Sequence, residues 1–165
     1  METSEIKTKY APAERASSES IYKSFLLFKD MDLLERLFSI VPNVILILNK
    51  ERQTVFCNQT LLELLKLNSF DEVLGKRPGE ILQCIHSKET PYGCGTTEFC
   101  SKCGAVNAIL NTQKSLKTSI EECRILVNRD SSIEALDLQV VTNIIEIEGE
   151  TYITFHITDI SDEKR

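Results

Sequence analysis

The sequence predicts one α+β domain built on a five-stranded antiparallel sheet with helices on one face. Two short β-prone runs precede a helix-rich middle part of the chain, and three longer runs with alternating apolar residues follow it. Strands that are grouped on either side of a set of helices are typical of α+β domains. The length of 165 residues suits a single domain with short extensions.

Before the sheet, the chain divides into a polar tail and an amphipathic helical segment. Residues 1–17 are polar and lack a hydrophobic period, so we expect a flexible tail. Residues 18–41 carry apolar residues at three- and four-residue steps, which predicts one helix or two short helices that meet near Asp30. Pro42 ends this segment because its ring cannot continue a helix. The apolar stripe is longer than a small domain needs for itself, so we expect the segment to pair with its copy in a homodimer.

The strands and the helices between them follow in order. Residues 44–48 and 54–57 are short β-prone runs joined by a polar turn, which predicts two paired strands. Helices are expected after Asn58, from Pro78 and after Gly104. Three further strands are predicted within residues 115–128, 132–149 and 150–161.

The overall charge and hydropathy narrow the possible partners. The net charge is −6, and an acidic surface repels phosphate backbones and anionic lipids, so neither a nucleic acid nor a membrane is an expected partner. No apolar run approaches the roughly 20 residues that span a bilayer. The N-terminal residues lack the apolar region of a secretory signal, so we expect a cytoplasmic protein.

Four of the six cysteines gather in one short, glycine-containing stretch: Cys84, Cys94, Cys100 and Cys103. Thiols stay reduced in the cytoplasm, where such a cluster favours metal binding or redox activity over structural disulfides. Cys100 and Cys103 form a CxxC pair, a spacing that lets both sulfurs face one metal. Cys57 and Cys123 each stand alone in a predicted strand and are expected to be small buried residues.

Two stretches of the sequence, "FCNQTLLELLKLNSFDEVLGKRPGEIL" and "ITDISDEKR", resemble parts of a known family. The first resembles the second strand and first helices of PAS domains, and the second resembles the phrase that closes many members of that family. The resemblance covers residues 37–165. It implies a PAS sensor domain over residues 42–161, with a cysteine-rich insertion at 84–104 and the start of an output linker at 162–165.

The resemblance also implies a function. PAS domains bind a cofactor or small molecule between sheet and helices, and they signal through the last strand to an output module, here expected to be a histidine kinase or cyclase in cis or in trans. No catalytic motif is present, so the chain itself is not expected to be an enzyme. Residues 93–104 ("GCGTTEFCSKCG") resemble an insertion of some bacterial PAS domains. Iron–sulfur PAS sensors with four cysteines also exist, and their better-known spacing is two CxxC pairs, from which this sequence departs.

Three kinds of site remain open for the cysteine cluster. Four thiolates suit an iron–sulfur cluster or a zinc ion by count. An iron–sulfur cluster is slightly favoured because a sensor needs a responsive group, whereas zinc would be structural. His86, two residues after Cys84, is a substitute ligand for either metal site. The third alternative is a metal-free thiol–disulfide switch at Cys100 and Cys103.

Overall fold

The computed structural model describes residues 6–164 and contains a five-stranded sheet in the order β2-β1-β5-β4-β3. Every neighbouring pair of strands is antiparallel, which confirms the predicted fold class. The strand bounds are Val44–Leu48 (β1), Thr54–Cys57 (β2), Ser119–Arg129 (β3), Ser132–Ile147 (β4) and Glu150–Asp159 (β5). Strand β3 pairs over its whole length with the first part of β4, from Arg129↔Ser132 to Ser119↔Thr142, and the turn between the two strands fixes this register.

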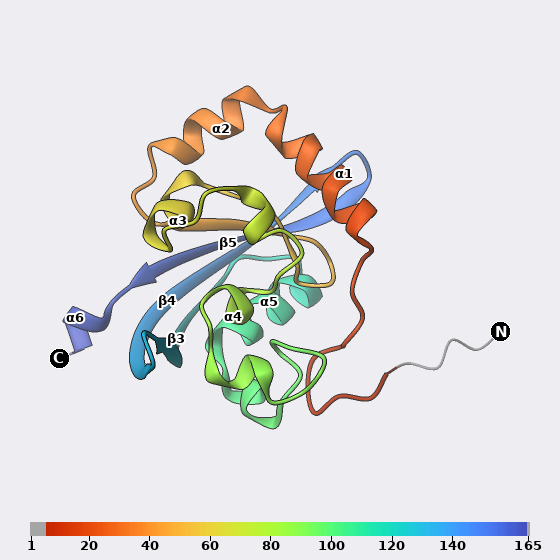
Figure 1. Cartoon of the computed structure of the whole chain (residues 1–165). Coiled ribbons are helices and arrows are strands. Elements are labelled where there is room, and N and C mark those ends of the chain that lie inside the picture. Colours follow the sequence, from red (N-terminus) through yellow and green to blue (C-terminus); the bar gives the residue numbers. More distant parts are fainter. Residues whose placement is uncertain (1–5, 165) are drawn as a thin grey trace.

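The helices between β2 and β3 cover one face of this sheet (Figure 1). They include three α-helices, α3 (Gln59–Leu64), α4 (Pro78–Ile81) and α5 (Gly104–Ser115), and three 3₁₀ helices, η1 (Phe70–Glu72), η2 (Ile85–Lys88) and η3 (Glu98–Lys102). The main core lies between this layer and the sheet, where Leu61 and Ile109 pack with residues such as Leu46 and Phe155. This interface also holds the candidate site described below.

The opposite face of the sheet is covered near β1, β2 and β5 by α1 (Ser18–Lys29) and α2 (Asp32–Ser39), which meet at Asp30 and Met31 as two short helices (Figure 1). Phe28 of α1 is fully buried and lies edge-on to Tyr152 of β5, with ring centroids 4.9 Å apart. Much of the apolar face of α1 is therefore used within the chain itself, whereas α2 contains no buried residue.

The described N-terminal residues differ from the expected flexible tail. Residues 6–17 run along the cysteine-containing loop (Figure 1), and Ala11 is only 1% exposed. The Ala11 amide donates a hydrogen bond to the Gly95 carbonyl, and the Lys9 amide donates one to Thr96. These backbone bonds join two segments that lie more than eighty positions apart in the sequence. A search for hydrophobic periodicity cannot detect such pairing, because no side-chain pattern encodes it.

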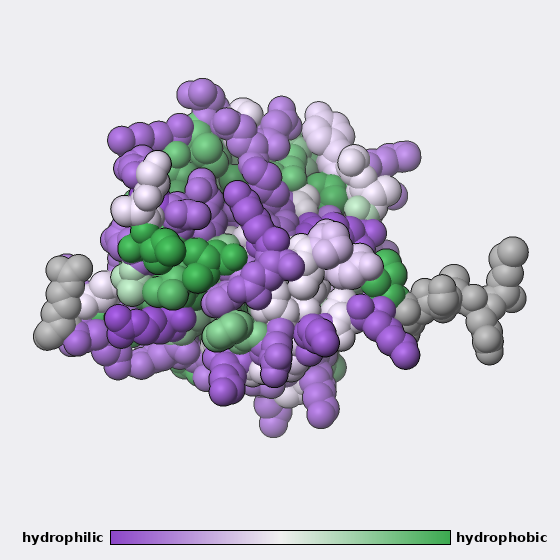
Figure 2. All heavy atoms as spheres, turned by 60° about the horizontal axis from the view of Figure 1, so that its bottom comes forward, coloured by the Kyte–Doolittle hydropathy of each residue, from purple (hydrophilic) through white to green (hydrophobic). Residues whose placement is uncertain are grey.

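A short helix, α6 (Ser161–Lys164), follows the last strand. None of the helices within residues 6–164 has the length and apolarity needed to cross a membrane. Figure 2 brings the lower side of Figure 1 forward and shows many hydrophilic side chains on that face, with a hydrophobic group at the left and smaller ones elsewhere.

Candidate functional site

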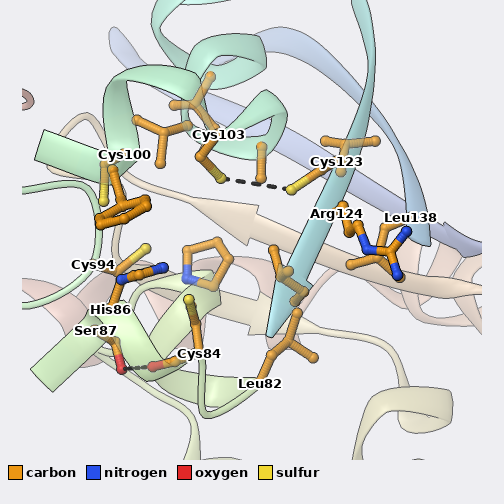
Figure 3. A pocket seen from close by; sticks show the side chains of 18 of the residues that line it. Leu82, Cys84, His86, Ser87, Cys94, Cys100, Cys103, Cys123, Arg124 and Leu138 are labelled. Atoms are coloured by element: carbon orange, nitrogen blue, oxygen red, sulfur yellow. Dashed lines mark hydrogen bonds between the residues drawn. The ribbon is translucent and has the colours of Figure 1, made fainter. Parts of the chain in front are cut away.

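A cavity of about 380 Å³ lies between the helical layer and the sheet (Figure 3). Five of the six cysteines line it: Cys84, Cys94, Cys100, Cys103 and Cys123. Apolar side chains of α5 and of the inner sheet face, such as Ile109 and Phe155, form much of the remaining wall. The four predicted ligands therefore line one cavity. Cys57 is buried in the core and is not among the residues that line the cavity.

Cys84 and Cys94 approach each other across Gly79. A Cβ atom on Gly79 would lie 2.8 Å from the Cys94 sulfur and 3.5 Å from the Cys84 Cβ, so a larger residue would collide with the site. The Cys84 amide donates a hydrogen bond to the Gly79 carbonyl, and Cys84 also forms an isolated bridge with Val127 of β3. Sequence reasoning placed this glycine only in a helical turn, because a close approach from residue 94 leaves no local signal.

Polar contacts fix the loop around Cys94. Its amide donates to the Glu80 carboxylate at 3.0 Å, and its carbonyl accepts from the Arg52 guanidinium at 3.2 Å. Arg52 also lines the cavity and is only 3% exposed, and burial lowers its pKa. Burial raises the pKa of the Cys94 thiol to about 12. A metal that binds there must therefore displace a proton, with Arg52 as the nearby positive charge.

The loop is further held by Arg77, whose side chain is fully buried. Its guanidinium donates to the backbone carbonyls of Glu51, Tyr92, Ala13 and Glu14. Burial lowers the pKa of Arg77 to about 10. The Arg77 side chain thus joins the turn after β1, the cysteine loop and the N-terminal segment. These hydrogen bonds also compensate for the burial of its positive charge.

The two sulfurs of the CxxC pair have different partners. The Cys100 sulfur lies 3.2 Å from the Thr97 hydroxyl, and the Cys103 sulfur lies 3.6 Å from the Cys123 sulfur. The hydrogen bond with Cys123 and those with the backbone amides of Val106 and Ala105 at the start of α5 lower the pKa of Cys103 to about 6, against the opposing effect of burial.

Cys123 is the site residue that sequence reasoning missed. It is 4% exposed, as expected for a small buried residue, but its side chain also faces the cavity from β3 (Figure 3). The contact with Cys103, together with burial, raises the pKa of the Cys123 thiol. Because Cys123 alternates with Ile125 and Val127 along the strand, the sequence indicates that Cys123 faces the core. It does not indicate which helix lies opposite Cys123.

His86 also lies in the cavity wall. Its Nδ1 pairs with the Glu89 carboxylate at 2.5 Å, and its ring stacks on Phe99 with the centroids 4.3 Å apart. A carboxylate on one ring nitrogen is the usual arrangement around metal-bound histidines, because it fixes the tautomer and leaves the other nitrogen to bind. These contacts keep His86 as a candidate substitute ligand.

The arrangement of the thiols can be compared with the two metal groups that four cysteines suit. A tetrahedral zinc site with bonds of about 2.3 Å needs sulfurs about 3.8 Å from one another. Within residues 6–164, no three His, Cys, Asp or Glu side chains are grouped closely enough to hold a single ion. An iron–sulfur cluster is bulkier than a single ion and is also held by cysteine thiolates. The cysteines that line the cavity supply the type of donor that an iron–sulfur cluster requires.

Comparisons with solved structures agree with this fold. The PAS domain of an HTR-like protein from Haloarcula marismortui is 17% identical, with a TM-score of 0.50, over 80% of this chain and 98% of that one. The PAS domain of nitrogen regulation protein NR(II) from Vibrio parahaemolyticus is 11% identical, with a TM-score of 0.52, over 79% of this chain and all of that one. The chain has the PAS fold.

A longer alignment includes the N-terminal helices. An RNA-binding Light-Oxygen-Voltage receptor is 15% identical, with a TM-score of 0.54, and the match covers 98% of this chain and 40% of the receptor. No protein-family model and no curated protein matches the sequence. The likeness is therefore one of fold, and the function must be argued from the site.

Proposed function

We propose that this chain is a sensory PAS domain whose cavity holds an iron–sulfur cluster and responds to oxygen or redox state. The cluster would be ligated by four thiolates: Cys84, Cys94, Cys100 and Cys103. The observation that supports this most directly is that these cysteines, from three segments of the loop, line one cavity at the usual ligand position between sheet and helices. In this proposal the chain is regulatory and is not an enzyme.

The residues of the chain have distinct parts in this proposal. When bound, an iron–sulfur cluster supplies a group that can gain or lose an electron. Four thiolates give such a site negative charge, and the buried Arg52 guanidinium provides a complementary charge in the same wall. Glu80 and Arg77 hold the loop that carries Cys94. The apolar wall limits the access of water.

The proposal includes a cellular setting and partners. All six cysteines are free in the structure, which suits the reducing cytoplasm. The signal would leave through β5 and α6 toward an output module such as a histidine kinase or cyclase, in cis or in trans. We further propose a homodimer in which the exposed face of α2 contacts its copy, because Leu33 and Ile40 are more than 70% exposed.

Metal analysis of the full chain, purified without oxygen, tests the proposed cluster. We expect a brown protein that contains iron and acid-labile sulfide. Serine substitution of each of the four ligands should remove most of the iron, because each variant leaves the cluster one thiolate short. Cys57→Ser is the matched control, since it alters a buried cysteine outside the cavity.

Other outcomes assign the site differently. One zinc per chain without sulfide would support a structural zinc site, and a metal-free protein would contradict the metal proposal. His86→Ala distinguishes four-thiolate ligation from mixed ligation: unchanged iron content supports the four cysteines alone, whereas a large loss makes His86 a ligand.

A further inference from the structure

We propose that Cys103 and Cys123 form a reversible disulfide when a peroxide reaches the cavity. This pair differs from the CxxC pair that the sequence suggests as a thiol switch. The inference does not rest on the cluster, because Cys123 is outside the proposed ligand set and the reaction belongs to the metal-free chain.

The distance between the two sulfurs is the first support. They lie 3.6 Å apart, whereas a disulfide bond is about 2.05 Å long, so the sulfurs need to approach by about 1.5 Å. Cys103 immediately precedes α5 and Cys123 lies within β3, so the bond would join two elements that are 20 positions apart in sequence. Small rotations about the two Cα–Cβ bonds can supply much of that approach.

The backbones of the two elements are also in contact at this point. A Cβ atom on Gly104 would lie 2.1 Å from the Glu122 carbonyl oxygen and 3.3 Å from the Cys123 Cβ. Only glycine allows the start of α5 to lie this close to β3. A disulfide requires Cα atoms within about 7 Å of each other, and this close packing provides the necessary proximity.

Cys100 is the competing partner, and its contacts make it less suitable. It lies in η3, where its sulfur contacts the Thr97 hydroxyl at 3.2 Å and its carbonyl accepts the Cys103 amide hydrogen. The sulfur–sulfur contact of Cys103 is instead with Cys123. In the metal-free chain, the geometry therefore favours the bond across the cavity wall.

The reaction balances with hydrogen peroxide as the oxidant. The thiolate of one cysteine attacks a peroxide oxygen, the O–O bond breaks, and a sulfenic acid forms with release of one water after protonation. The sulfur of the second cysteine then attacks the sulfenic sulfur, and the S–O bond breaks to release a second water. Two thiols and one peroxide give one disulfide and two waters. A thiol reductant returns the pair to two thiols.

Peptide mapping of the full chain can identify this bond directly. Trypsin cleaves after Lys102, so Cys100 and Cys103 fall in different peptides, and Cys123 falls in a third. Metal-free protein is treated with hydrogen peroxide, its remaining thiols are alkylated, and the digest is analysed by mass spectrometry without reduction. We expect the peptide of residues 103–114 to be joined to that of residues 118–124 in most chains, and dithiothreitol should separate them.

Two variants provide the controls. Cys123→Ser should abolish the joined species, whereas Cys57→Ser, which alters a buried cysteine outside the cavity, should leave it unchanged. The inference is overturned if residues 103–114 are joined instead to residues 89–102, which contain Cys94 and Cys100, or if both thiols remain fully alkylated.

The iron content of Cys123→Ser separates this inference from the proposed function. Retained iron together with loss of the disulfide supports both proposals. If the wild-type chain contains no iron but still forms the disulfide, the proposed cluster is contradicted and the disulfide proposal stands. Loss of iron in Cys123→Ser would make Cys123 a metal ligand and would contradict its separate role.

Discussion

At the scale of single residues, Glu80 links the cysteine loop to the rest of the domain. Its carboxylate accepts hydrogen bonds from the Arg15 side chain and from the amides of Cys94 and Arg77. Burial alone would raise the pKa of Glu80, but these hydrogen bonds outweigh it, and the pKa lies below its ordinary value. The charged form of Glu80 is therefore the one that the fold stabilises.

This shift predicts a pH-dependent contribution to stability. Because the folded-state pKa of Glu80 is lower than the unfolded value of about 4.3, the stabilisation is present above that pH and is lost as the pH falls through the folded value. Glu80→Gln should lower the free energy of unfolding by about 1.5–3 kcal/mol at pH 7, the usual range for hydrogen bonds to a charged group. Urea unfolding at neutral and acid pH should show the difference between the two proteins shrinking in acid.

Glu63→Gln is the control for this experiment. Glu63 is an exposed glutamate in α3, and its substitution should change stability little at either pH. An equal loss for Glu80→Gln at neutral and acid pH would show that the effect comes from shape and not from charge.

At the scale of elements, the contact between α5 and β3 decides the geometry of the cavity wall. Gly104→Ala places a methyl group 2.1 Å from the Glu122 carbonyl oxygen, so the helix must move away from the strand. We expect a loss of roughly 1–3 kcal/mol in the free energy of unfolding, as for other overpacked sites. The yield of the Cys103–Cys123 disulfide should fall as well, because the two sulfurs move apart.

Denaturant titration and the peptide map measure these two effects. Asn111→Ala changes an exposed position of the same helix and should affect neither. Wild-type stability in Gly104→Ala would mean that α5 adjusts without moving away from β3.

A second prediction at this scale concerns assembly through α2. Leu33 and Leu37 are 71% and 51% exposed and lie one turn apart on the same face. Charged residues there should prevent two apolar faces from meeting, so the double variant Leu33→Lys and Leu37→Lys should convert a dimer to a monomer. Light scattering measures the mass of both forms.

Leu64→Lys provides the comparison, since Leu64 is a 58% exposed leucine in α3, outside the proposed interface. A dimer that persists in the α2 double variant would assign the interface to another surface. Deleting the whole N-terminal segment is a less specific test, because α1 carries Phe28, which is fully buried against the sheet.

At the scale of the whole molecule, β3 lies between the cavity and the C-terminal helix. Cys123 faces the cavity, while its neighbour Glu122 forms an ion pair with Lys164 of α6 at 2.8 Å. The entry to α6 is fastened to β4, because the Ile160 amide donates to the Asp137 carbonyl. Strand β3 therefore contacts both the cavity and α6, so a change at the cavity wall can alter the contacts of α6.

This path predicts that the state of the cavity alters the C-terminal segment. If the proposed cluster joins the cysteine loop to the start of α5, its removal should loosen β3 and the contact of β3 with α6. Amides of residues 160–164 should then exchange hydrogen faster than in the loaded protein, as measured by mass spectrometry. Strand β1 should show no change, and equal exchange at residues 160–164 in both states would argue against this route.

The sequence by itself determined the strands, the helices and the location of the thiol cluster. Alternating residues such as Cys123, Ile125 and Val127 indicate a strand with one buried face, and Pro42 ends the first helical segment. These signals are local: periodicity, turn residues and cysteine spacing are properties of short stretches of chain. The order of the elements was then enough to predict the antiparallel sheet.

Only the tertiary structure decided which side chains meet. Cys123 lies beside Cys103 because the start of α5 packs on β3 at Gly104. The absence of a side chain on Gly79 leaves room for Cys84 and Cys94 to lie close to it. Residues 6–17 lie along the cysteine loop through backbone hydrogen bonds that leave no side-chain pattern. The physical reason is the same in each case: sheet register and helix packing set distances between residues far apart in sequence, and no local segment contains that information.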